Sequence, residues 1–438
     1  MTKPLKVALV GLGTVGGGTF SVLKDNAAEI ERRVGFPIQI AVVADLNAER
    51  ARQVAGEGVD ISSDAFEVVN RPDVDVVVEL IGGYTVAKQL VLAAIAAGKH
   101  VVTANKALLA VHGEEIFAAA EKNHVMVGFE AAVAGGIPVI KAIKEGLAAN
   151  QIEYVAGIIN GTCNFILSEM RDKGLPFAEV LSQAQALGYA EADPTFDIEG
   201  VDAAHKITLL SALAFGIPVR FDKAYIEGIT KLTKEDIEFA EQLGYRVKLL
   251  GITRRTDKGV ELRVHPTLIP AKRLIANVEG VMNAVLVKAN AVGPTLYYGA
   301  GAGSLPTASA VVADIIEIAR ASQVPLESRV PVMAFKTSGV DQNVCMLGMS
   351  EVVTAFYLRL TVADKPGVLA DVTRILANQN ISIEAMIQRQ AEDESGQADI
   401  VLLTHRCIEG DFNAAMVEIE ALDAVVEPMV RVRVEDLS

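Results

Sequence analysis

The feature that most constrains the fold is a glycine loop close to the start of the chain. An apolar, β-branched run at 6–10 leads directly into GLGTVG at 11–16. A G-x-G-x-x-G loop between a buried strand and a helix is typical of a dinucleotide-binding βαβ unit. Gly11 permits a tight turn, Gly13 lets the backbone approach a pyrophosphate, and Gly16 allows close packing of the helix. The alternative is a tight connection that binds nothing.

Similar apolar runs recur through the first third of the chain. They occupy 38–44, 75–81, 100–102 and 125–129, and Ala-rich segments such as 86–97 and 113–121 separate them. Strands that are buried on both faces and alternate with helices form parallel sheets with helices on each side. We therefore expect an α/β fold of Rossmann type, with a doubly wound parallel sheet.

Asp45 stands at the end of the second expected strand. An acidic residue in this place can accept hydrogen bonds from the adenosine ribose, which would favour NAD over NADP. The alternative is that Asp45 caps a helix that begins near Asn47. No Arg immediately follows Asp45 to receive a 2′-phosphate, although Arg50 and Arg52 lie about one turn further on. The preference between NAD and NADP therefore stays open.

The section from about 150 to 304 mixes strand-like pieces with helices, so we expect an α+β substrate-binding and dimerisation domain. Its expected helices lie around 164–172, 176–187, 201–214 and 234–248. Apolar residues at helical spacing in 309–320 predict a further helix, which can return to pack on the first domain.

The chain changes character after a polar link near 321–350. The run at 354–362 alternates strictly, with Phe356 on one side and Tyr357 on the other, which predicts a half-buried strand. Helix, two strands, helix and strand follow, and this β-α-β-β-α-β order is the ferredoxin-like arrangement. The expected domains are 1–133 plus about 305–340 for the dinucleotide, 134–304 for the substrate, and 351–438 for this small domain.

Composition and charge exclude several classes of protein. A net charge of −15 argues against nucleic acid or an anionic membrane as a partner, because both favour clustered Lys and Arg. No apolar stretch approaches the ~18 residues that predict a membrane span. Cys163, Cys345 and Cys407 lie far apart, in no metal-ligand or disulfide pattern. We expect a soluble protein of the reducing cytoplasm.

The run GYAEADPTFDIEGVD at 188–202 contains the candidate substrate residues. Glu191 and Asp202 are carboxylates that can hold an ammonium group, and Lys206 follows Asp202 by four residues, so both project from one helix face. The alternative is a surface ion pair of little consequence. Glycine and proline make the stretch a turn-rich loop, and loops of this kind usually carry function.

A second lysine, Lys106, follows the expected strand at 100–102. The crevice beyond the carboxyl end of such a strand holds the nicotinamide in doubly wound sheets. Lysines in crowded surroundings shift their pKa readily, which suits them to proton transfer. The alternative is a solvent-facing lysine at a helix start, although a cation is disfavoured there.

Six motifs together give the chain a family resemblance. They are GLGTVG (11–16), TANKAL (103–108), EAAVAGGIP (130–138), NGTCNFIL (160–167), the run 188–206, and GAGAGSLPTA (299–308). This set resembles homoserine dehydrogenase over nearly the whole chain. The resemblance implies reversible hydride transfer between NAD(P)H and L-aspartate 4-semialdehyde, which gives L-homoserine for the biosynthesis of threonine, methionine and isoleucine.

The resemblance also implies roles for individual residues. Lys206 would donate a proton to the aldehyde oxygen and Lys106 would assist it. The substrate-binding residues would be Gly188, Glu191, Asp197 and Asp202. The cofactor would be lined by Gly11, Leu12, Gly13, Thr14, Val15, Gly16, Asp45, Thr103, Lys106, Gly188 and Gly303. Ala44 departs from the family pattern, where an arginine that contacts a 2′-phosphate is common, so NADP preference is in doubt.

By the same resemblance, a monovalent cation such as sodium would bind Glu130 and the main-chain oxygens of Val133, Gly135 and Ile137. The alternative is a plain strand-to-helix turn with Glu130 in solvent.

The C-terminal segment resembles an ACT domain through ADKPGVLADV at 363–372 and NQNISI at 378–383. Such domains bind amino acids between paired copies, so the resemblance implies threonine as a feedback ligand and a homodimer or homotetramer. Gly367 and the N–H groups that follow it open a helix N-terminus that suits a carboxylate. The alternative is a module that only dimerises.

Two other functions compete with this one. The first is an amino-acid sensor that keeps a nucleotide fold without catalysis. The second is an acylating semialdehyde dehydrogenase, which needs a nucleophilic cysteine near a base. Cys163 is the candidate nucleophile, but the motif around it contains no histidine.

Overall fold

The computed structural model describes residues 3–390 and 396–438. The chain folds into two compact units. The first comprises Met1–Ile159, His205–Asp222 and Asn283–Val344. The second comprises Asn160–Ala204, Lys223–Met282 and Cys345–Ser438.

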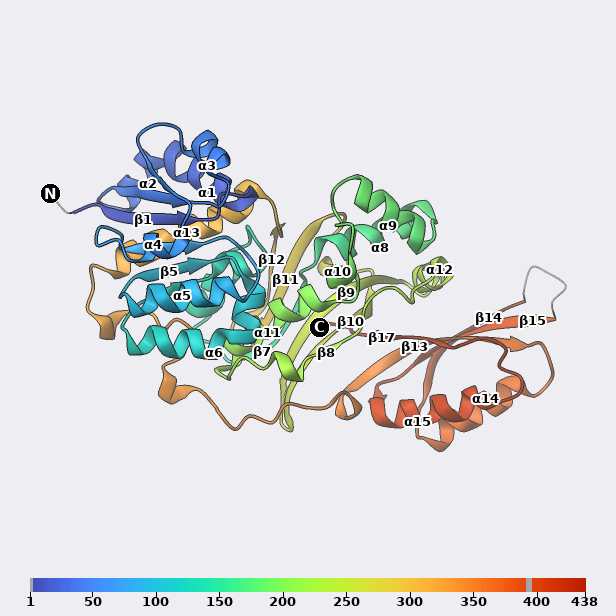
Figure 1. Cartoon of the computed structure of the whole chain (residues 1–438). Helices are drawn as coiled ribbons and strands as arrows, with labels where there is room; N and C mark the ends of the chain where they lie inside the picture. The colour runs from blue at the N-terminus through green and yellow to red at the C-terminus, as the bar shows by residue number, and fades with distance from the viewer. Residues whose placement is uncertain (1–2, 391–395) are drawn as a thin grey trace. The chain divides into compact units, whose positions relative to one another are not determined.

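The first unit is built on a parallel sheet of six strands in the order β3-β2-β1-β4-β5-β6. The strands are β1 (Leu5–Val10), β2 (Ile38–Ala44), β3 (Asp60–Ser62), β4 (Val76–Glu79), β5 (His100–Thr103) and β6 (Val127–Gly128). The helices between them are α1 (Thr14–Asp25), α2 (Ala27–Val34), α3 (Ala48–Ala55), α4 (Ala65–Val69), α5 (Val86–Ala96) and α6 (Lys106–Lys122). Helices lie on both sides of this sheet (Figure 1), so the predicted doubly wound fold is confirmed.

The strand order reverses between β1 and β4, which are neighbours in the sheet. Val10 at the end of β1 is in register with Ala44 of β2 and with Glu79 of β4. The carboxyl ends of these three strands therefore meet at one edge, and in doubly wound folds ligands bind at such a reversal.

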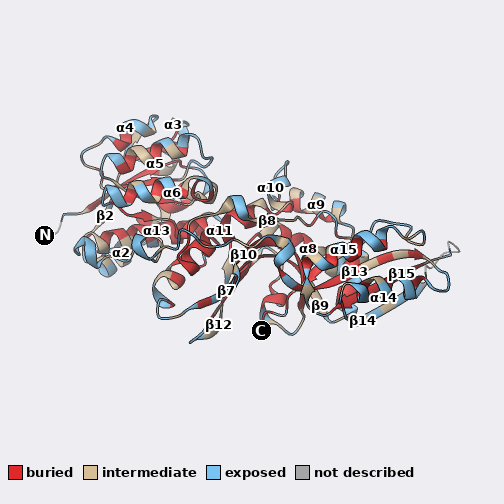
Figure 2. Ribbon diagram, turned by 90° about the horizontal axis from the view of Figure 1, so that it is seen from below, coloured by how far each residue is buried: buried red, intermediate tan, exposed pale blue. Residues whose placement is uncertain are grey.

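The predicted return helix is α13 (Ser304–Ala321). Its buried Val311, Val312 and Ile315 join a core that also contains Leu9 of β1 and Phe20 of α1. A Cβ on Gly18 would lie 2.7 Å from the Ser304 carbonyl oxygen, so glycine permits the close crossing of α1 and α13. Figure 2 shows the strands of this sheet as mostly buried and the outward helix faces as exposed.

The first unit also contains strands that lie outside the doubly wound sheet. They are β7 (Ile152–Ile158), β11 (Met282–Ala289) and β12 (Gly293–Ala300), with β11 antiparallel to β7 and next to β12. The short helix α7 (Val139–Lys141) and a π-helical turn (Ala142–Gly146) precede β7.

In the second unit, β9 (Tyr245–Thr256) and β10 (Gly259–Pro270) form a long antiparallel hairpin. Its helices are α8 (Gly161–Lys173), α9 (Phe177–Ala186), α10 (Thr195–Ile198) and α12 (Lys234–Gln242). The predicted helix over 234–248 is wrong in its second half. Gly244 has a φ of +83°, a left-handed conformation that ends the helix, and β9 begins at Tyr245.

The C-terminal part has the predicted ferredoxin-like order. It consists of β13 (Val353–Ala363), α14 (Val368–Asn378), β14 (Ile383–Gln390), β15 (Gln397–Thr404), β16 (Cys407–Ile408), α15 (Glu409–Glu420) and β17 (Val430–Val434). Phe356 lies on the face of the sheet that α14 and α15 cover, in one core with Val372 and Phe412. Tyr357 lies on the opposite face and is also fully buried, and its hydroxyl donates to Asp236 of α12 at 3.1 Å. The strand is therefore not half-buried as expected.

Within the described ranges, no helix has the length and apolar character needed to cross a membrane.

Candidate functional site

The glycine loop has the geometry that its motif predicts. Gly11 has a φ of +91°, and a Cβ there would lie 2.7 Å from the carbonyl oxygen of Leu80. A Cβ on Gly16 would lie 1.9 Å from the carbonyl oxygen of Gly11. A Cβ on Gly13, in contrast, would meet nothing within 4 Å. Internal packing thus explains Gly11 and Gly16, whereas the open space at Gly13 suits the close approach of a ligand to the N-terminus of α1.

Asp45 is tied to this loop. Its buried carboxylate accepts hydrogen bonds from the main-chain N–H of Leu12 at 2.7 Å and of Asn47 at 2.8 Å, and Arg50 Nη2 lies 3.0 Å away. Burial alone would raise its pKa, but these hydrogen bonds lower it below the usual value. Asn47, not Asp45, caps α3, because its side chain accepts from the Arg50 N–H. The helix-cap alternative is therefore wrong, and the ribose contact stays a prediction.

Thr103 and Lys106 lie at the carboxyl end of β5, where a buried acid orders the backbone. Glu79 Oε2 accepts from the Thr103 hydroxyl at 2.7 Å, and its Oε1 accepts from the N–H groups of Ile81 and Gly82. Asn105 caps α6, and Lys106 is the first residue of that helix and is partly exposed. Sequence reasoning missed Glu79, although a charged residue at the end of an apolar run was a signal.

The segment from Glu130 to Ile137 turns tightly between β6 and α7. The Glu130 carboxylate accepts from the N–H groups of Ile140 and Lys141, each at 2.8 Å. Burial raises its pKa to about 7, against the hydrogen bonds that lower it. Glu130 is 5% exposed, so the alternative with this residue in solvent is wrong.

Gly135 has a φ of +50°, and a Cβ there would lie 2.4 Å from the carbonyl oxygen of Gly301. The preceding Ala134 also has a positive φ, of 56°. Among residues 3–390 and 396–438, no group of three or more His, Cys, Asp or Glu side chains is arranged to hold a metal ion. A cation in this bend would therefore need main-chain oxygens beside Glu130.

Asn160 joins two of the predicted substrate carboxylates. Its Nδ2 donates to Asp197 Oδ1 at 2.7 Å and to Asp202 Oδ2 at 2.9 Å. Its Oδ1 accepts from the Cys163 N–H at 2.8 Å and so caps α8. Asp202 is 4% exposed and needs such a donor. Asn160 begins the motif NGTCNFIL, but it was not among the site residues predicted from the sequence.

Glu191 and Gly188 lie on the loop after α9. The Glu191 side chain is exposed, and its main-chain oxygen accepts from Gln185 Nε2 at 3.1 Å. Gly188 is exposed, with a φ of +74°. The structure thus brings Asp197 and Asp202 together through Asn160, while Glu191 is placed at the surface of the loop.

Lys206 and Asp202 both belong to α11 (Val201–Phe215), one turn apart. Lys206 is 9% exposed, and its ammonium group donates to the carbonyl oxygen of Ile159 at 2.7 Å. Burial of both residues contradicts the alternative of a surface ion pair. A buried ammonium held on a carbonyl oxygen is placed for proton transfer and for stabilising an oxyanion.

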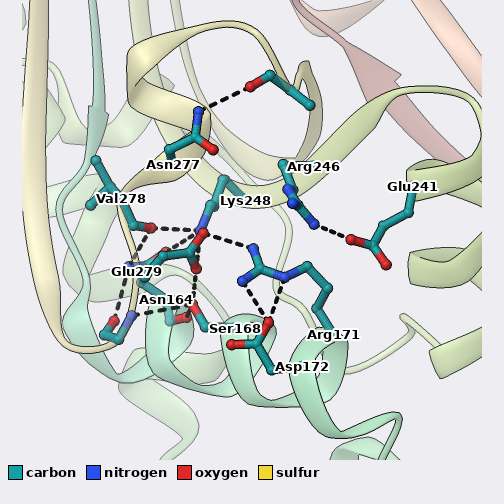
Figure 3. A network of polar contacts seen from close by, with 12 residues as sticks. Asn164, Ser168, Arg171, Asp172, Glu241, Arg246, Lys248, Asn277, Val278 and Glu279 are labelled. Atoms are coloured by element: carbon teal, nitrogen blue, oxygen red, sulfur yellow. Dashed lines mark hydrogen bonds and ion pairs between the residues drawn. The ribbon is translucent and has the colours of Figure 1, made fainter.

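Helix α8, which begins after Asn160, is anchored by the network in Figure 3. Lys248 Nζ donates to the Val278 carbonyl oxygen at 2.6 Å and to Asn164 Oδ1 at 3.1 Å, and it pairs with Glu279. Burial lowers the pKa of Lys248 to about 8, against the attraction of Glu279. No sequence motif marked this network.

Cys163 is fully buried, and its thiol lies 3.2 Å from the Asp197 carbonyl oxygen as a donor. A nucleophile must reach its substrate, so this cysteine does not fit an acylating dehydrogenase.

Three family models match the chain. Homoserine dehydrogenase matches residues 138–316, and homoserine dehydrogenase, NAD binding domain, matches residues 11–130. The ACT domain matches residues 356–424.

Relatives agree over the full length. The chain is 60% identical to the homoserine dehydrogenase of Neisseria gonorrhoeae, over 99% of each chain. It is 59% identical to that of Pseudomonas aeruginosa, over 100% of each. The crystal structure of a homoserine dehydrogenase from Thiobacillus denitrificans matches with a TM-score of 0.95 and 61% identity, and covers 100% of this chain and 99% of that one. A hyperthermophilic archaeal homoserine dehydrogenase in complex with NADPH shares the fold over 74% of this chain and 99% of that one, with a TM-score of 0.63 and 24% identity.

Proposed function

The chain belongs to the homoserine dehydrogenase family, and on that premise we propose how its residues carry out the reversible, NAD(P)-dependent reduction of L-aspartate 4-semialdehyde to L-homoserine. The observation that carries the proposal is the placement of Asp202 and Lys206 on one turn of α11, both buried, with Asp202 joined to Asp197 by Asn160.

Asp202 and Asp197 bind the substrate's ammonium group, with Glu191 as the third carboxylate of the loop. Each carboxylate oxygen can accept more than one hydrogen bond, so an oxygen that accepts from the Asn160 amide can also accept from an ammonium group. Lys206 donates a proton to the aldehyde oxygen. Negative charge builds on this oxygen as hydride reaches the carbonyl carbon, and an ammonium group both stabilises and protonates it. Lys106 assists from the start of α6.

The residues of the glycine loop fit a dinucleotide, which supplies or accepts the hydride when bound. The open space at Gly13 and the N–H groups at the start of α1 would hold the pyrophosphate. Thr14, Val15, Asp45, Thr103, Gly188 and Gly303 complete the predicted lining. The match of residues 11–130 to the NAD binding domain of homoserine dehydrogenase supports a nicotinamide cofactor, NAD or NADP.

A monovalent cation such as sodium binds Glu130 with the main-chain oxygens of Val133, Gly135 and Ile137. The buried Glu130 supports this, because a cation would favour the ionised form of a carboxyl whose pKa burial raises to about 7.

The ACT domain binds an amino acid, which we propose to be threonine, at the N-terminus of α14. The N-cap residue of this helix is Gly367, which has no side chain to accept from the first N–H groups of the helix, and this suits the binding of a carboxylate there. A homodimer or homotetramer, the three domain ranges and a cytoplasmic location remain predictions.

Two substitutions at Lys206 test the proposal. Lys206→Met should lower kcat by about 10²- to 10⁴-fold, the usual contribution of a general acid, and leave cofactor binding unchanged in fluorescence titrations. Lys206→Arg keeps the charge but holds its proton too firmly, so its kcat should also fall steeply. Lys248→Met removes another buried lysine that donates to a carbonyl oxygen and serves as the control. Turnover of Lys206→Met close to that of the control would contradict the proton-donor role.

A further inference from the structure

The last strand of the ACT domain shares an edge of β10 with a short strand of the substrate-binding part. β9 pairs with β10 over its whole length, from Gly259 to Pro270. On the other edge, β8 (Tyr225–Ile226) pairs in parallel at Arg263 and Val264. β17 pairs in parallel at Thr267 and Leu268. β8 and β17 therefore follow one another along the same edge.

Arg433 of β17 connects these two strands. Its Nε and Nη2 donate to the two carboxylate oxygens of Glu409, the first residue of α15, at 2.8 and 2.5 Å. Its Nη1 donates to Glu227 Oε2 at 2.8 Å, and its Nη2 donates to the Tyr225 hydroxyl at 3.1 Å. The guanidinium carbon lies 4.8 Å from the centre of the Tyr225 ring.

This contact resists displacement because it is buried. Arg433 is 2% exposed and Glu409 is 1% exposed. Burial would raise the pKa of Glu227, but the charge of Arg433 outweighs it and lowers the pKa. The Tyr225 hydroxyl donates to the same Glu227 oxygen at 2.7 Å. Separation of these groups would leave a buried charge without its partner, which is energetically costly. A displacement of β17 should therefore displace β8 as well.

The chain after β8 lies against the turn between α10 and α11. The Ile229 N–H donates to the Ile198 carbonyl oxygen at 2.9 Å, and the Thr230 hydroxyl donates to Glu199 Oε1 at 3.1 Å. A Cβ on Gly228 would lie 2.3 Å from the Ile198 carbonyl oxygen and 2.5 Å from the Glu199 Cα. The two backbones are thus in direct contact.

The turn at 198–200 also packs on β10 itself. Gly200 has a φ of +84°, and a Cβ there would lie 3.1 Å from the Val264 side chain. Asp197 immediately precedes this turn and Asp202 follows it by two residues. A continuous series of contacts therefore runs from the ACT domain through Tyr225 and Glu227 to the two carboxylates.

We propose that Arg433 is a positioning residue for substrate affinity, which acts through Tyr225, Glu227 and the turn 198–200 on Asp197 and Asp202. The ACT domain thereby supplies a support of the substrate loop. The inference rests on the proposed function, in which these carboxylates bind the ammonium group of homoserine. Because they bind substrate and do not transfer the proton, the link affects KM for homoserine more than kcat.

The full-length enzyme offers a matched pair of variants for the test. Tyr225→Phe removes one hydroxyl that donates to a carboxylate paired with an arginine. Tyr357→Phe makes the same change at Asp236 and Arg359, which join the ACT domain to α12 and not to the turn 198–200. The Tyr225 hydroxyl also accepts from Arg433 Nη2, so Tyr225→Phe loses both contacts and should raise KM for homoserine about three- to tenfold. We expect kcat and the cofactor KM to stay within about twofold, and Tyr357→Phe to leave all three unchanged.

Glu227→Gln should raise KM in the same way, because the guanidinium loses its second carboxylate. Combination with Asp202→Asn separates positioning from general destabilisation. If Tyr225 acts through Asp202, Tyr225→Phe adds little to the KM of Asp202→Asn, whereas an independent effect multiplies it.

Equal KM changes in the two tyrosine variants, or none in Tyr225→Phe, would overturn the inference. A multiplied effect in the double variant would overturn the part of the inference that acts on Asp202. If Asp202→Asn itself leaves KM unchanged, the ammonium site of the proposed function fails. If Asp202→Asn raises KM but Tyr225→Phe does not, only the link fails.

Discussion

Replacement of Asn160 by serine isolates one function of this side chain. Serine and asparagine are about equally good helix N-caps, so Asn160→Ser should keep the capping of α8. The shorter hydroxyl cannot replace an amide that donates to Asp197 at 2.7 Å and to Asp202 at 2.9 Å. The variant therefore removes the support of both carboxylates and leaves the start of the helix in place.

The size of the effect follows from these two contacts. A hydrogen bond to a charged group contributes about 1.5–3 kcal/mol, so the pair contributes at least about 3 kcal/mol to holding the carboxylates in place. If half of this is expressed in homoserine binding, the loss is about 1.5 kcal/mol, or roughly a tenfold increase in KM. The pair does not touch the proton donor, so kcat should change by less than about threefold.

Initial rates of homoserine-dependent NAD(P)H formation measure both constants, and thermal unfolding reports stability. Asn160→Ala should show the same KM increase and lose a further ~1 kcal/mol of stability with the cap. Asn164→Ser is the control, because Asn164 lies one turn later on α8 and donates to the carbonyl oxygens of Val278 and Gly280 instead. A homoserine KM within twofold of wild type in a folded Asn160→Ser enzyme would refute the reasoning.

Three further predictions concern the cofactor loop, the buried charges and the cation. Gly13→Ala should keep the melting temperature, because a Cβ there meets no protein atom within 4 Å, but it should raise the cofactor KM, because the Cβ would enter the space proposed for the pyrophosphate. Gly16→Ala should lower the melting temperature, because its Cβ would lie 1.9 Å from the Gly11 carbonyl oxygen. An unchanged cofactor KM in Gly13→Ala would contradict the pyrophosphate site. Burial would raise the pKa of Glu435, but Arg263 and Arg254 lower it to about 2. A depressed carboxyl stabilises the fold above its unfolded pKa and loses this contribution as pH falls, so stability should decrease between pH about 4.5 and 2, and less so in Glu435→Gln, as chemical denaturation at each pH would reveal. Exchange of sodium for a bulky organic cation should lower the melting temperature of wild type but not of Glu130→Gln, and an equal decrease in both would argue against the cation site.

Local patterns carried most of what the sequence predicted correctly about the fold. The strand, glycine loop and helix at 6–16 are read from neighbouring residues, because turn geometry and helix packing at Gly11 and Gly16 depend on atoms a few residues away. The helix over 309–320 was predicted from helical spacing alone. The helix expected over 234–248 failed at Gly244, where a residue in the left-handed conformation separates α12 from β9.

The candidate site was predicted through its motif residues and not through the groups that position them. Lys206, Asp202 and Asp197 stand in a recognisable run, but Asn160, which joins the two carboxylates, lies 42 residues before Asp202. Glu79 orders the end of β5 from 24 residues before Thr103. These supporting residues are ordinary polar side chains whose meaning depends on the tertiary fold, so no spacing rule selects them.

Sequence separation explains why the support of the site is harder to predict than its chemistry. The Glu130 N–H donates to Asp314 across 184 residues, and Arg433 reaches Glu227 across 206. A buried polar group must find a partner somewhere, but the sequence does not say where, because any complementary group that the fold brings near will satisfy it. Arg433 illustrates the consequence. It lies in the last strand of the range 351–438, which the sequence predicts to be a separate small domain. Pairing of β17 with β10 instead places the guanidinium on Glu227 and the Tyr225 hydroxyl, so under the proposed link a substitution at Arg433 should raise the homoserine KM.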